Sequence, residues 1–497
     1  MLTNRIDEAS ITASCGGEQR EVAVQLGIRP GNYPYNKIAA AHGAEYVLVL
    51  PLDQVADYKN NPDFKSKTII GLDDPSNWER VCAALDANGH LRDGQKYLFF
   101  PERDLYVSAA AHLRQRFGDG ARAYVAPDKE ALPAKLKAAG IEPLPCAMVK
   151  AVMKFGEDAA GKTARDAYLN DAILSIGGFP VVLKATNASA EYGIVPADDF
   201  DQLVQGIHRY KGQKTESGAE LVWSLQKQAD GPEYCIEGFV DREGNKHIVH
   251  GGQKFARAMP GEKYQLGGTI GHDHESLQTL EGGRLLELGK RAAEALDFPT
   301  GPFTMDIVKT LSNGTLHLID TAHGRIPGLV VQPSIRKATG YDWADLSYCL
   351  QAGKPIPFPE EVKKNGLLPV HMTLSDDDGA VFDEVVRRTS RIHRASQVAY
   401  GDAIDSSSSP AMKAYMNRRG SSYAFFEAES STDAAEVFKA VICERRGGVM
   451  KPIECYSRPD LASAKQCGAS GSAGSSGLPT IERAAPSPFP RPPGSPD

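Results

Sequence analysis

Residues 304–325 read TMDIVKTLSNGTLHLIDTAHGR and carry most of the information about the fold. Two apolar runs lie in and beside this stretch, at 303–308 and 316–319, and the turn-forming sequence Ser-Asn-Gly at 312–314 separates them. Short aliphatic and β-branched runs joined by Asn-Gly are typical of a β-hairpin. The stretch therefore predicts two neighbouring antiparallel strands.

Each predicted strand carries one carboxylate, Asp306 in the first and Asp320 at the end of the second, and Arg325 follows. A carboxylate flanked by aliphatic residues is costly to bury unless a partner offsets its charge. A divalent cation bound through oxygen ligands is one such partner. The alternative is two surface carboxylates on alternating strands, and the residues upstream favour the metal.

Length and composition exclude several classes of protein. The 497 residues are enough for two to four domains, and 41% hydrophobic with 24% charged content is typical of a soluble protein. A net charge of -7 argues against a nucleic-acid binder, and no apolar run predicts a membrane span or a signal peptide. Eight cysteines without a CxxC pair favour reduced thiols and a cytoplasmic location.

Local periodicity predicts two α/β regions. Strand-like runs at 46–50, 68–70 and 97–100 alternate with helical stretches at 78–85 and 105–117, which predicts a small layer with a parallel sheet. Further on, the pattern predicts helices at 129–139, 285–296 and 433–443, and strands at 179–184, 368–374 and 423–427. The segment GHDH at 271–274 is expected to be a solvated loop rather than a metal cluster.

Two upstream segments suit a nucleotide. Lys184 ends an apolar strand, and the loop after it holds the small residues Ser189 and Gly193, whose backbone N–H groups can fold over phosphates. The pattern is not a P-loop, because Gly-Lys-Ser/Thr is absent. The linker at 221–231 can offer its backbone edge to a purine, and Glu233 can accept from ribose hydroxyls. Taken alone, a lysine at the end of a strand before a loop is common, and Glu233 is better explained as a solvent-facing strand residue.

The order of these parts resembles the ATP-grasp superfamily, and within it the carboxylate–amine ligases, including amino-acid ligases that make dipeptides. The resemblance rests on Asp128-Lys129, on GFPVVLK at 178–184 with its loop, on GPEY at 231–234, on GPFTMD at 301–306 and on LIDTAHGRIPG at 318–328. It implies an α/β (α+β) protein with an ATP-grasp domain at 119–365. A preceding Rossmann-like α/β domain at 1–118, a trailing α/β subdomain at 366–460 and a disordered Gly/Ser/Pro tail at 461–497 complete the expected organisation.

The resemblance also implies the site, with ATP and Mg²⁺ as cofactors. Its phosphate contacts are Lys129, Lys184 and the loop 186–193, with Ser189 and Gly193; its adenine contacts are Gln226, Lys227, Gln228 and Ala229; its ribose contact is Glu233. Asp306 and Asp320 hold Mg²⁺, and Arg325 steadies an acyl phosphate. Arg257, Lys263 and His323 are candidate substrate contacts.

This sequence departs from the family pattern after the second carboxylate. Asp320 stands where Glu is usual, Ala322 where Asn is usual, and Arg325 comes one residue late. The extra residue suggests a strand bulge that turns His323 toward the metal, as a hydrogen-bonding neighbour rather than a ligand.

The function that the resemblance implies is ATP-dependent joining of a carboxylate to an amine, through an acyl phosphate, with release of ADP and phosphate. Amino acids or a small specialised metabolite are the expected substrates, with no nucleic acid and no membrane involved; a homodimer is left open. The alternatives are a biotin-carboxylase-like carboxylase, although no Met-Lys-Met segment is present, and a non-catalytic nucleotide-binding protein.

We expect the chain without residues 468–497 to fold and turn over as the full chain does. That segment is rich in Gly, Ser, Ala and Pro and has little apolar surface to bury. Melting temperature and ATP turnover of the truncated and full chains check this. A lower melting temperature or a lost activity would contradict it.

Overall fold

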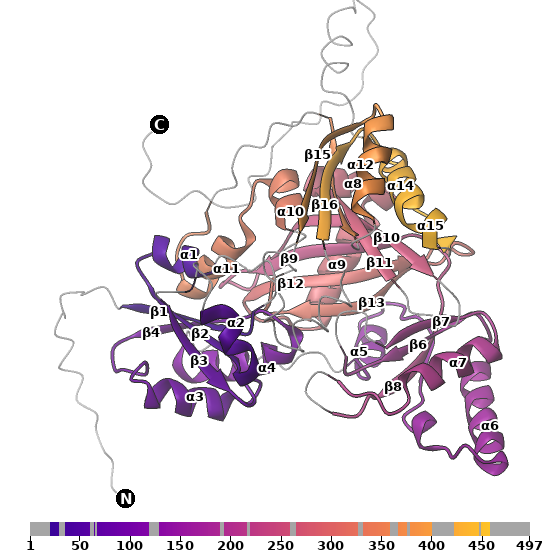
Figure 1. Ribbon diagram of the computed structural model, residues 1–497, viewed down its shortest axis with the longest axis horizontal. Coiled ribbons are helices and arrows are strands. Elements are labelled where there is room, and N and C mark those ends of the chain that lie inside the picture. Colours follow the sequence, from indigo (N-terminus) through magenta and orange to yellow (C-terminus); the bar gives the residue numbers. More distant parts are fainter. Residues whose placement is uncertain are drawn as a thin grey trace, which may run out of the picture.

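The computed structural model describes residues 20–28, 35–59, 64, 67–118, 129–188, 193–215, 219–258, 265–326, 332–357, 366–374, 378–399, 422–446 and 449–457. Three sheets organise these residues, and Figure 1 shows them as three separate bodies. The predicted tail lies outside the described residues. Within them, no helix is both long enough and apolar enough to cross a membrane.

The first sheet is parallel and has the strand order β3-β2-β1-β4, which confirms the predicted parallel layer. Its strands are β1 (Glu21–Leu26), β2 (Glu45–Pro51), β3 (Thr68–Leu72) and β4 (Lys96–Pro101). The strands β1, β2 and β4 are nearly continuous in apolar residues because both faces of the sheet are covered. On one face pack α3 (Trp78–Ala87) and α4 (Asp104–Phe117); on the other pack α1 (Tyr35–Ala41) and α11 (Trp343–Ala352).

The second sheet is antiparallel, with four short strands in the order β5-β8-β6-β7. These strands are β5 (Cys146–Met148), β6 (Val181–Ala185), β7 (Ile194–Ala197) and β8 (Trp223–Lys227). The helices α6 (Ala159–Ser175) and α7 (Phe200–Tyr210) bury their apolar faces against it. Only one face needs this cover, so β6 alternates buried and half-buried residues.

The third sheet has nine antiparallel strands and crosses the middle of the molecule in Figure 1. Its order is β13-β12-β9-β10-β11-β14-β16-β15, with β17 paired to β10. The strands are β9 (Glu233–Val240), β10 (Lys246–Ala258), β11 (Gln265–Asp273), β12 (Gly301–Lys309), β13 (Leu316–His323), β14 (Leu368–Leu374), β15 (Ile392–Ala399), β16 (Ser422–Ala428) and β17 (Val449–Met450). The sheet is continuous across residue 366, where the trailing subdomain was expected to begin.

One face of this sheet is apolar and lies against α9 (Arg284–Ala295). The leucines of α9 recur at the helical spacing and pack on Ile236, Met305 and Ile307. Further along the sheet, α12 (Gly379–Arg388) and α14 (Ser431–Phe438) cover β14 and β16. The remaining elements include α2 (Val55–Lys59), α5 (Leu132–Ala138), α8 (His274–Thr279), α10 (Gln332–Thr339) and α15 (Glu444–Arg446).

The GHDH segment at 271–274 is not a solvated loop. His272 is fully buried at the end of β11, Asp273 caps α8 by accepting from the Ser276 N–H, and His274 begins that helix. The expectation was wrong because β10 and β11 are rich in glycine, which conceals their strand pattern.

The side chain of Gln351 links α11 to the edge strand of the first sheet through two hydrogen bonds. The Phe99 N–H donates to Oε1 of Gln351 at 2.9 Å, and Nε2 of Gln351 donates to the Phe99 carbonyl at 3.0 Å. The buried amide thus takes the place of a further strand beside β4.

We expect Gln351→Leu to destabilise the protein, because it leaves both backbone groups of Phe99 buried without a partner. Each such group costs about 1–3 kcal/mol. Melting temperatures of this variant and of Gln278→Leu, whose amide is exposed on α8, check the prediction. Equal melting temperatures for the two variants would contradict it.

Candidate active site

The two predicted carboxylates lie directly opposite each other. The hairpin forms as expected, and β12 pairs with β13 so that Asp306 faces Asp320. A bulge shifts the register between these residues and the next pair, Ile307 and Leu318, so the extra residue is Ile319. Like charges on opposed strand positions repel. The pair therefore requires cations.

The same face of the sheet carries two more charged side chains. Cys235 on β9 pairs with Asp306, and Gly252 on β10 pairs with Cys235. Side chains two residues apart on a strand share a face, so Glu233 and Lys254 project to the side on which Asp306 lies. The carboxylate face and the apolar α9 face are thus the two sides of one sheet.

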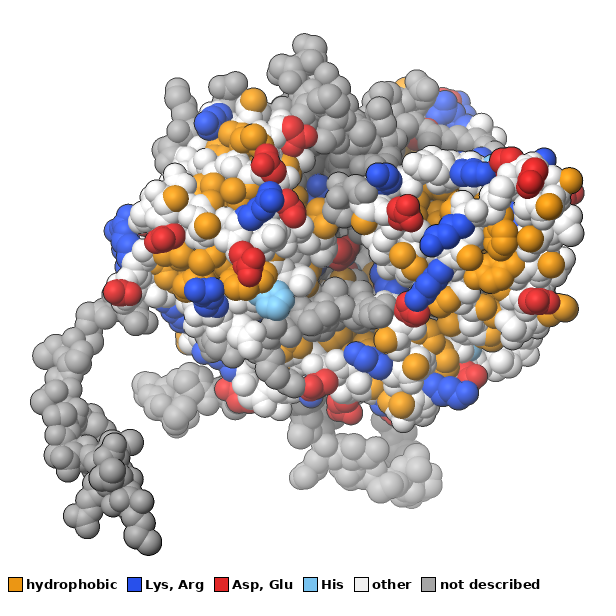
Figure 2. Space-filling view, turned by 90° about the horizontal axis from the view of Figure 1, so that it is seen from below, with side chains coloured by type: hydrophobic (Ala, Val, Ile, Leu, Met, Phe, Trp, Pro, Cys, Tyr) orange, Lys and Arg blue, Asp and Glu red, His pale blue; other side chains and the backbone are white. Residues whose placement is uncertain are grey.

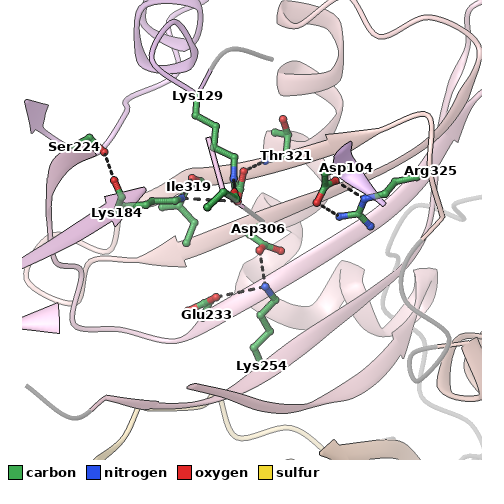
Figure 3. A network of polar contacts seen from close by, with 12 residues as sticks. Asp104, Lys129, Lys184, Ser224, Glu233, Lys254, Asp306, Ile319, Thr321 and Arg325 are labelled. Carbon is green, nitrogen blue, oxygen red and sulfur yellow. Dashed lines mark hydrogen bonds and ion pairs between the residues drawn. The ribbon is translucent and has the colours of Figure 1, made fainter. Parts of the chain in front are cut away.

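Three lysines neutralise these carboxylates, as Figure 3 shows. The Nζ atom of Lys129 lies 2.9 Å from Oδ2 of Asp320, and that of Lys184 lies 3.9 Å from the same oxygen. Lys184 also donates to the Ile319 carbonyl at 2.9 Å. Asp306 is neutralised by the third lysine: Nζ of Lys254 lies 2.7 Å from Oδ2 of Asp306 and 3.4 Å from Oε1 of Glu233.

The lysines come from separate parts of the chain. Lys129 lies in the turn before α5, Lys184 lies on β6 of the second sheet, and Lys254 lies on β10 of the third. Figure 2 shows that the molecule is hollowed between the lobe with β1–β4 and the lobe with β5–β8. The charged cluster therefore forms where these bodies meet.

Burial and mutual charge set the pKa values of the cluster. Burial raises the pKa of Asp306, and the nearby Glu233 and Asp320 raise it further, although Lys254 opposes them. Burial would also raise the pKa of Asp320, but Lys129 and Lys184 outweigh it and hold that pKa well below its usual range. The two carboxylates thus differ: Asp320 ionises readily, whereas Asp306 resists ionisation.

The pKa values of the three lysines are also shifted in different directions. Burial lowers the pKa of Lys184, and repulsion from Lys129 adds to this effect against the attraction of Asp320. For Lys129 and Lys254, the effect of burial is overcome by the facing carboxylates, so the pKa of each is raised. Lys184 is therefore the ammonium least stabilised by its present neighbours.

Arg325 pairs with a residue of the first body. Its guanidinium contacts both carboxylate oxygens of Asp104, with Nη2 3.1 Å from Oδ2. Asp104 begins α4, where the positive end of the helix favours an acid. The charge of Asp104 also raises the pKa of Lys129. Arg325 is thus linked to the lysine cluster through Asp104 rather than directly to Asp320.

The expected adenine segment lies at the junction of the second and third sheets. The ammonium of Lys227 donates to the Gly178 and Phe179 carbonyls at 3.0 and 2.8 Å, and the Gln228 N–H donates to the Pro180 carbonyl. Ala229 is buried against Leu144, Val308 and Ile319. Gln226 is a ladder residue of β8.

Gly193 closes the loop that begins after Ala185. Its φ of +79° and its position, where an added Cβ would lie 2.6 Å from the Ala185 Cβ, both require glycine. The Gly193 carbonyl accepts from the Ala185 N–H at 2.9 Å. Ser189 and the tip of this loop lie outside the described residues.

Of the three predicted substrate contacts, the structure describes only the side chain of His323. His323 is buried on the opposite face of β13, stacks on Phe298 and donates from Nε2 to the Pro299 carbonyl at 2.8 Å. Burial lowers its pKa to about 3, so the ring is neutral. The expected turn of His323 toward the metal was wrong, because the bulge precedes Asp320. Lys263 and the side chain of Arg257 lie outside the described residues.

Sequence reasoning missed three charged residues of the site: Lys254, Asp104 and Lys451. The Lys451 ammonium lies 3.7 Å from Oε2 of Glu233, and its segment pairs with the end of β10. Lys254 gave no signal of its own, because the histidines and glycines of β10 conceal the strand on which it lies. Asp104 follows a parallel strand at its carboxyl end, where such sheets place ligand-binding residues.

Comparison with solved structures identifies the fold. The structure of L-amino acid ligase from Bacillus licheniformis superimposes with a TM-score of 0.58 at 15% identity, over 86% of this chain and 98% of that chain. The chain has the ATP-grasp fold. No protein-family model and no curated protein sequence matches it at a significant level.

Other enzymes with the ATP-grasp fold match similarly. The ADP complex of N5-carboxyaminoimidazole ribonucleotide synthetase gives a TM-score of 0.57 at 13% identity, over 86% of this chain and 97% of that chain. Biotin carboxylase from Campylobacter jejuni, in a β,γ-ATP complex, gives 0.55 at 14% identity, over 87% and 92%. The similar structures are thus ligases and carboxylases, several of them with a bound adenine nucleotide.

The two opposed carboxylates should affect stability with opposite signs. Asp320 has a lowered pKa, so its ionised form contributes stability that is present above the unfolded pKa and lost as pH falls through the folded one. Asp306 has a raised pKa, so its ionisation costs stability as pH rises. Without metal or nucleotide at pH 7, we expect Asp320→Asn to cost about 1–3 kcal/mol and Asp306→Asn to cost nothing.

Melting temperatures of the two variants in chelator-treated buffer test this pair. Each variant is the matched control for the other, because both exchange one carboxylate oxygen for an amide nitrogen. A drop for Asp306→Asn as large as that for Asp320→Asn would contradict the assignment.

Proposed function

We propose that this protein is an ATP-dependent ligase that joins a carboxylate to an amine through an acyl phosphate and releases ADP and phosphate. Amino acids or small specialised metabolites are its proposed substrates. The observation that supports it best is the opposed pair Asp306 and Asp320, held by Lys129, Lys184 and Lys254 at the junction of three bodies. A purely structural role would not require two opposed carboxylates.

The donor chemistry of the site fits ATP with Mg²⁺. Asp306 and Asp320 offer oxygen ligands on one face, which is the ligand type that Mg²⁺ takes, and the bound ion neutralises charge on phosphate oxygens. Lys184 and Lys129 supply ammonium groups that the phosphates can bind in competition with the Asp320 carboxylate. Both carboxylates are about a quarter exposed and can be reached.

The apolar cluster of Leu144, Ala229, Val308 and Ile319 fits the base of the nucleotide. This cluster joins the expected adenine segment, residues 226–229 between the second and third sheets, to the strand that carries Asp306. Glu233 lies at the beginning of β9, next to this adenine segment, and in the described structure its carboxylate is held by Lys254 and Lys451. We propose that Glu233 exchanges one of these partners for the ribose hydroxyls.

The residues of this chain divide the chemical work. Lys184, the ammonium least favoured by its present neighbours, stabilises the negative charge on the transferred phosphoryl group. Lys254 keeps Asp306 ionised against its raised pKa. Arg325, held by Asp104, offers a fixed guanidinium to the oxyanion that forms when the amine attacks the acyl carbon.

The test follows oxygen from the substrate carboxylate. The protein is incubated with MgATP, an amine panel and a panel of ¹⁸O-labelled amino acids and small carboxylic acids. We expect ADP, with label transferred into inorganic phosphate. Arg325→Ala should lower the rate by about 10²–10³ with a smaller effect on ATP affinity, and Asp306→Asn should abolish turnover.

Other outcomes identify the rivals. AMP with pyrophosphate as products, or phosphate without label, would overturn the acyl-phosphate mechanism. Phosphate release that depends on bicarbonate and biotin instead would favour a carboxylase. Arg325→Lys serves as the matched control, because it keeps the charge but loses the bidentate fork on Asp104.

A further inference from the structure

A group of side chains that could hold a metal ion lies on other elements than the carboxylate pair. His42 follows α1 in the first body, and Asp345 and Cys349 lie one turn apart on α11. One nitrogen, one oxygen and one sulfur of these residues lie within 4.8 Å of one another. The described residues contain no other such group of His, Cys, Asp and Glu.

The three donor atoms surround one point. Nε2 of His42 lies 2.7 Å from Oδ1 of Asp345, and Sγ of Cys349 lies 3.9 Å from the same oxygen. Two tetrahedral zinc ligands at about 2.0–2.1 Å from the ion are about 3.3 Å apart. The His42–Asp345 contact would open by about half an ångström to admit an ion with such bonds, whereas the sulfur is already at a suitable separation.

The neighbours of the group fix the imidazole. The His42 ring stacks on Tyr348 with centroids 4.4 Å apart and an angle of 10° between the planes. The ring plane, and with it the direction of Nε2, is therefore set by packing. The neighbouring cation Lys354 has its charge offset by Glu21 at 2.7 Å.

The group is open to solvent on one side and closed on the other. About a quarter of the His42 and Asp345 side chains is exposed, while Cys349 is buried. An ion can enter past the histidine and the carboxylate and meet the sulfur last.

We propose that His42, Asp345 and Cys349 form a binding site for Zn²⁺ or a similar thiophilic divalent ion, distinct from the carboxylate pair. One nitrogen, one oxygen and one sulfur suit Zn²⁺, whereas Mg²⁺ prefers oxygen alone. The ion joins α11 to the end of α1, and so ties the first body to the segment between β13 and β14 of the third sheet.

Binding requires a proton to leave. Burial and the Asp345 carboxylate raise the pKa of the Cys349 thiol to about 12, so the free site holds S–H at neutral pH. The metal takes the place of that proton: the S–H bond breaks, a sulfur–metal bond forms, and one H⁺ passes to solvent. In the free site the Nε2–H of His42 donates to the Asp345 carboxylate, so this N–H bond also breaks: the proton is carried to Nδ1 of the same ring and Nε2 bonds to the ion instead.

Co²⁺ is the probe, because thiolate ligation gives it a charge-transfer band that oxygen and nitrogen ligands do not give. The full chain is titrated with Co²⁺ in excess Mg²⁺, which keeps the carboxylate pair occupied. We expect one equivalent to bind, with a thiolate band and a higher melting temperature. Cys349→Ser should remove the band. His42→Gln should weaken binding at least tenfold, since even the loss of an outer partner typically costs about 10–100-fold.

Two controls make the result decisive. Cys82→Ser changes another thiol of the first body and should leave the band unchanged, and Asp306→Asn should also leave it unchanged. Absence of a thiolate band in the parent, a band that survives Cys349→Ser, or a band lost in Asp306→Asn would overturn the site. If Cys349→Ser does not fold, His42→Gln at its partly exposed position carries the test.

Discussion

Two carboxylates face each other across the β12–β13 hairpin, and three lysines hold them there. Neither strand can relieve the repulsion alone, because the register that opposes Asp306 to Asp320 also buries the apolar face on α9. Shifting one strand by one residue would turn its carboxylate into the α9 core. The charge of the pair must therefore be balanced by lysines on other elements, which requires those elements to lie next to the hairpin.

Each lysine arrives on a different element, so the charge balance depends on how the bodies are docked. Lys184 reaches Asp320 only because β6 ends beside the hairpin, and Asp104 reaches Arg325 only because α4 begins there. A change in the angle of the second sheet would alter the environment of Lys184 first. Because its pKa is lowered, Lys184 is the ammonium of the three whose charge is least stabilised by the protein around it.

The hairpin and the parallel sheet were predictable from the local sequence. The positions of Lys254 and His323 were not, because they depend on how the strands pair. The hairpin and the parallel layer come from short apolar runs that need no distant partner to be read. Lys254 could not be assigned because β10 is interrupted by His and Gly, and its role appears only when β10 pairs with β9. His323 was misplaced because the bulge was expected after Asp320; once it lies before, three residues of regular strand turn the ring away.

The third sheet continues beyond residue 366, because residues 268–270 of β11 pair with residues 370–372 of β14. A chain cut at this point would leave the backbone N–H and C=O groups of β11 open along a glycine-rich strand. Such a free edge pairs readily with the same edge of another molecule. β14 thus protects the edge of β11 from self-association, and any attempt to isolate the residues before 366 has to supply a substitute for this strand.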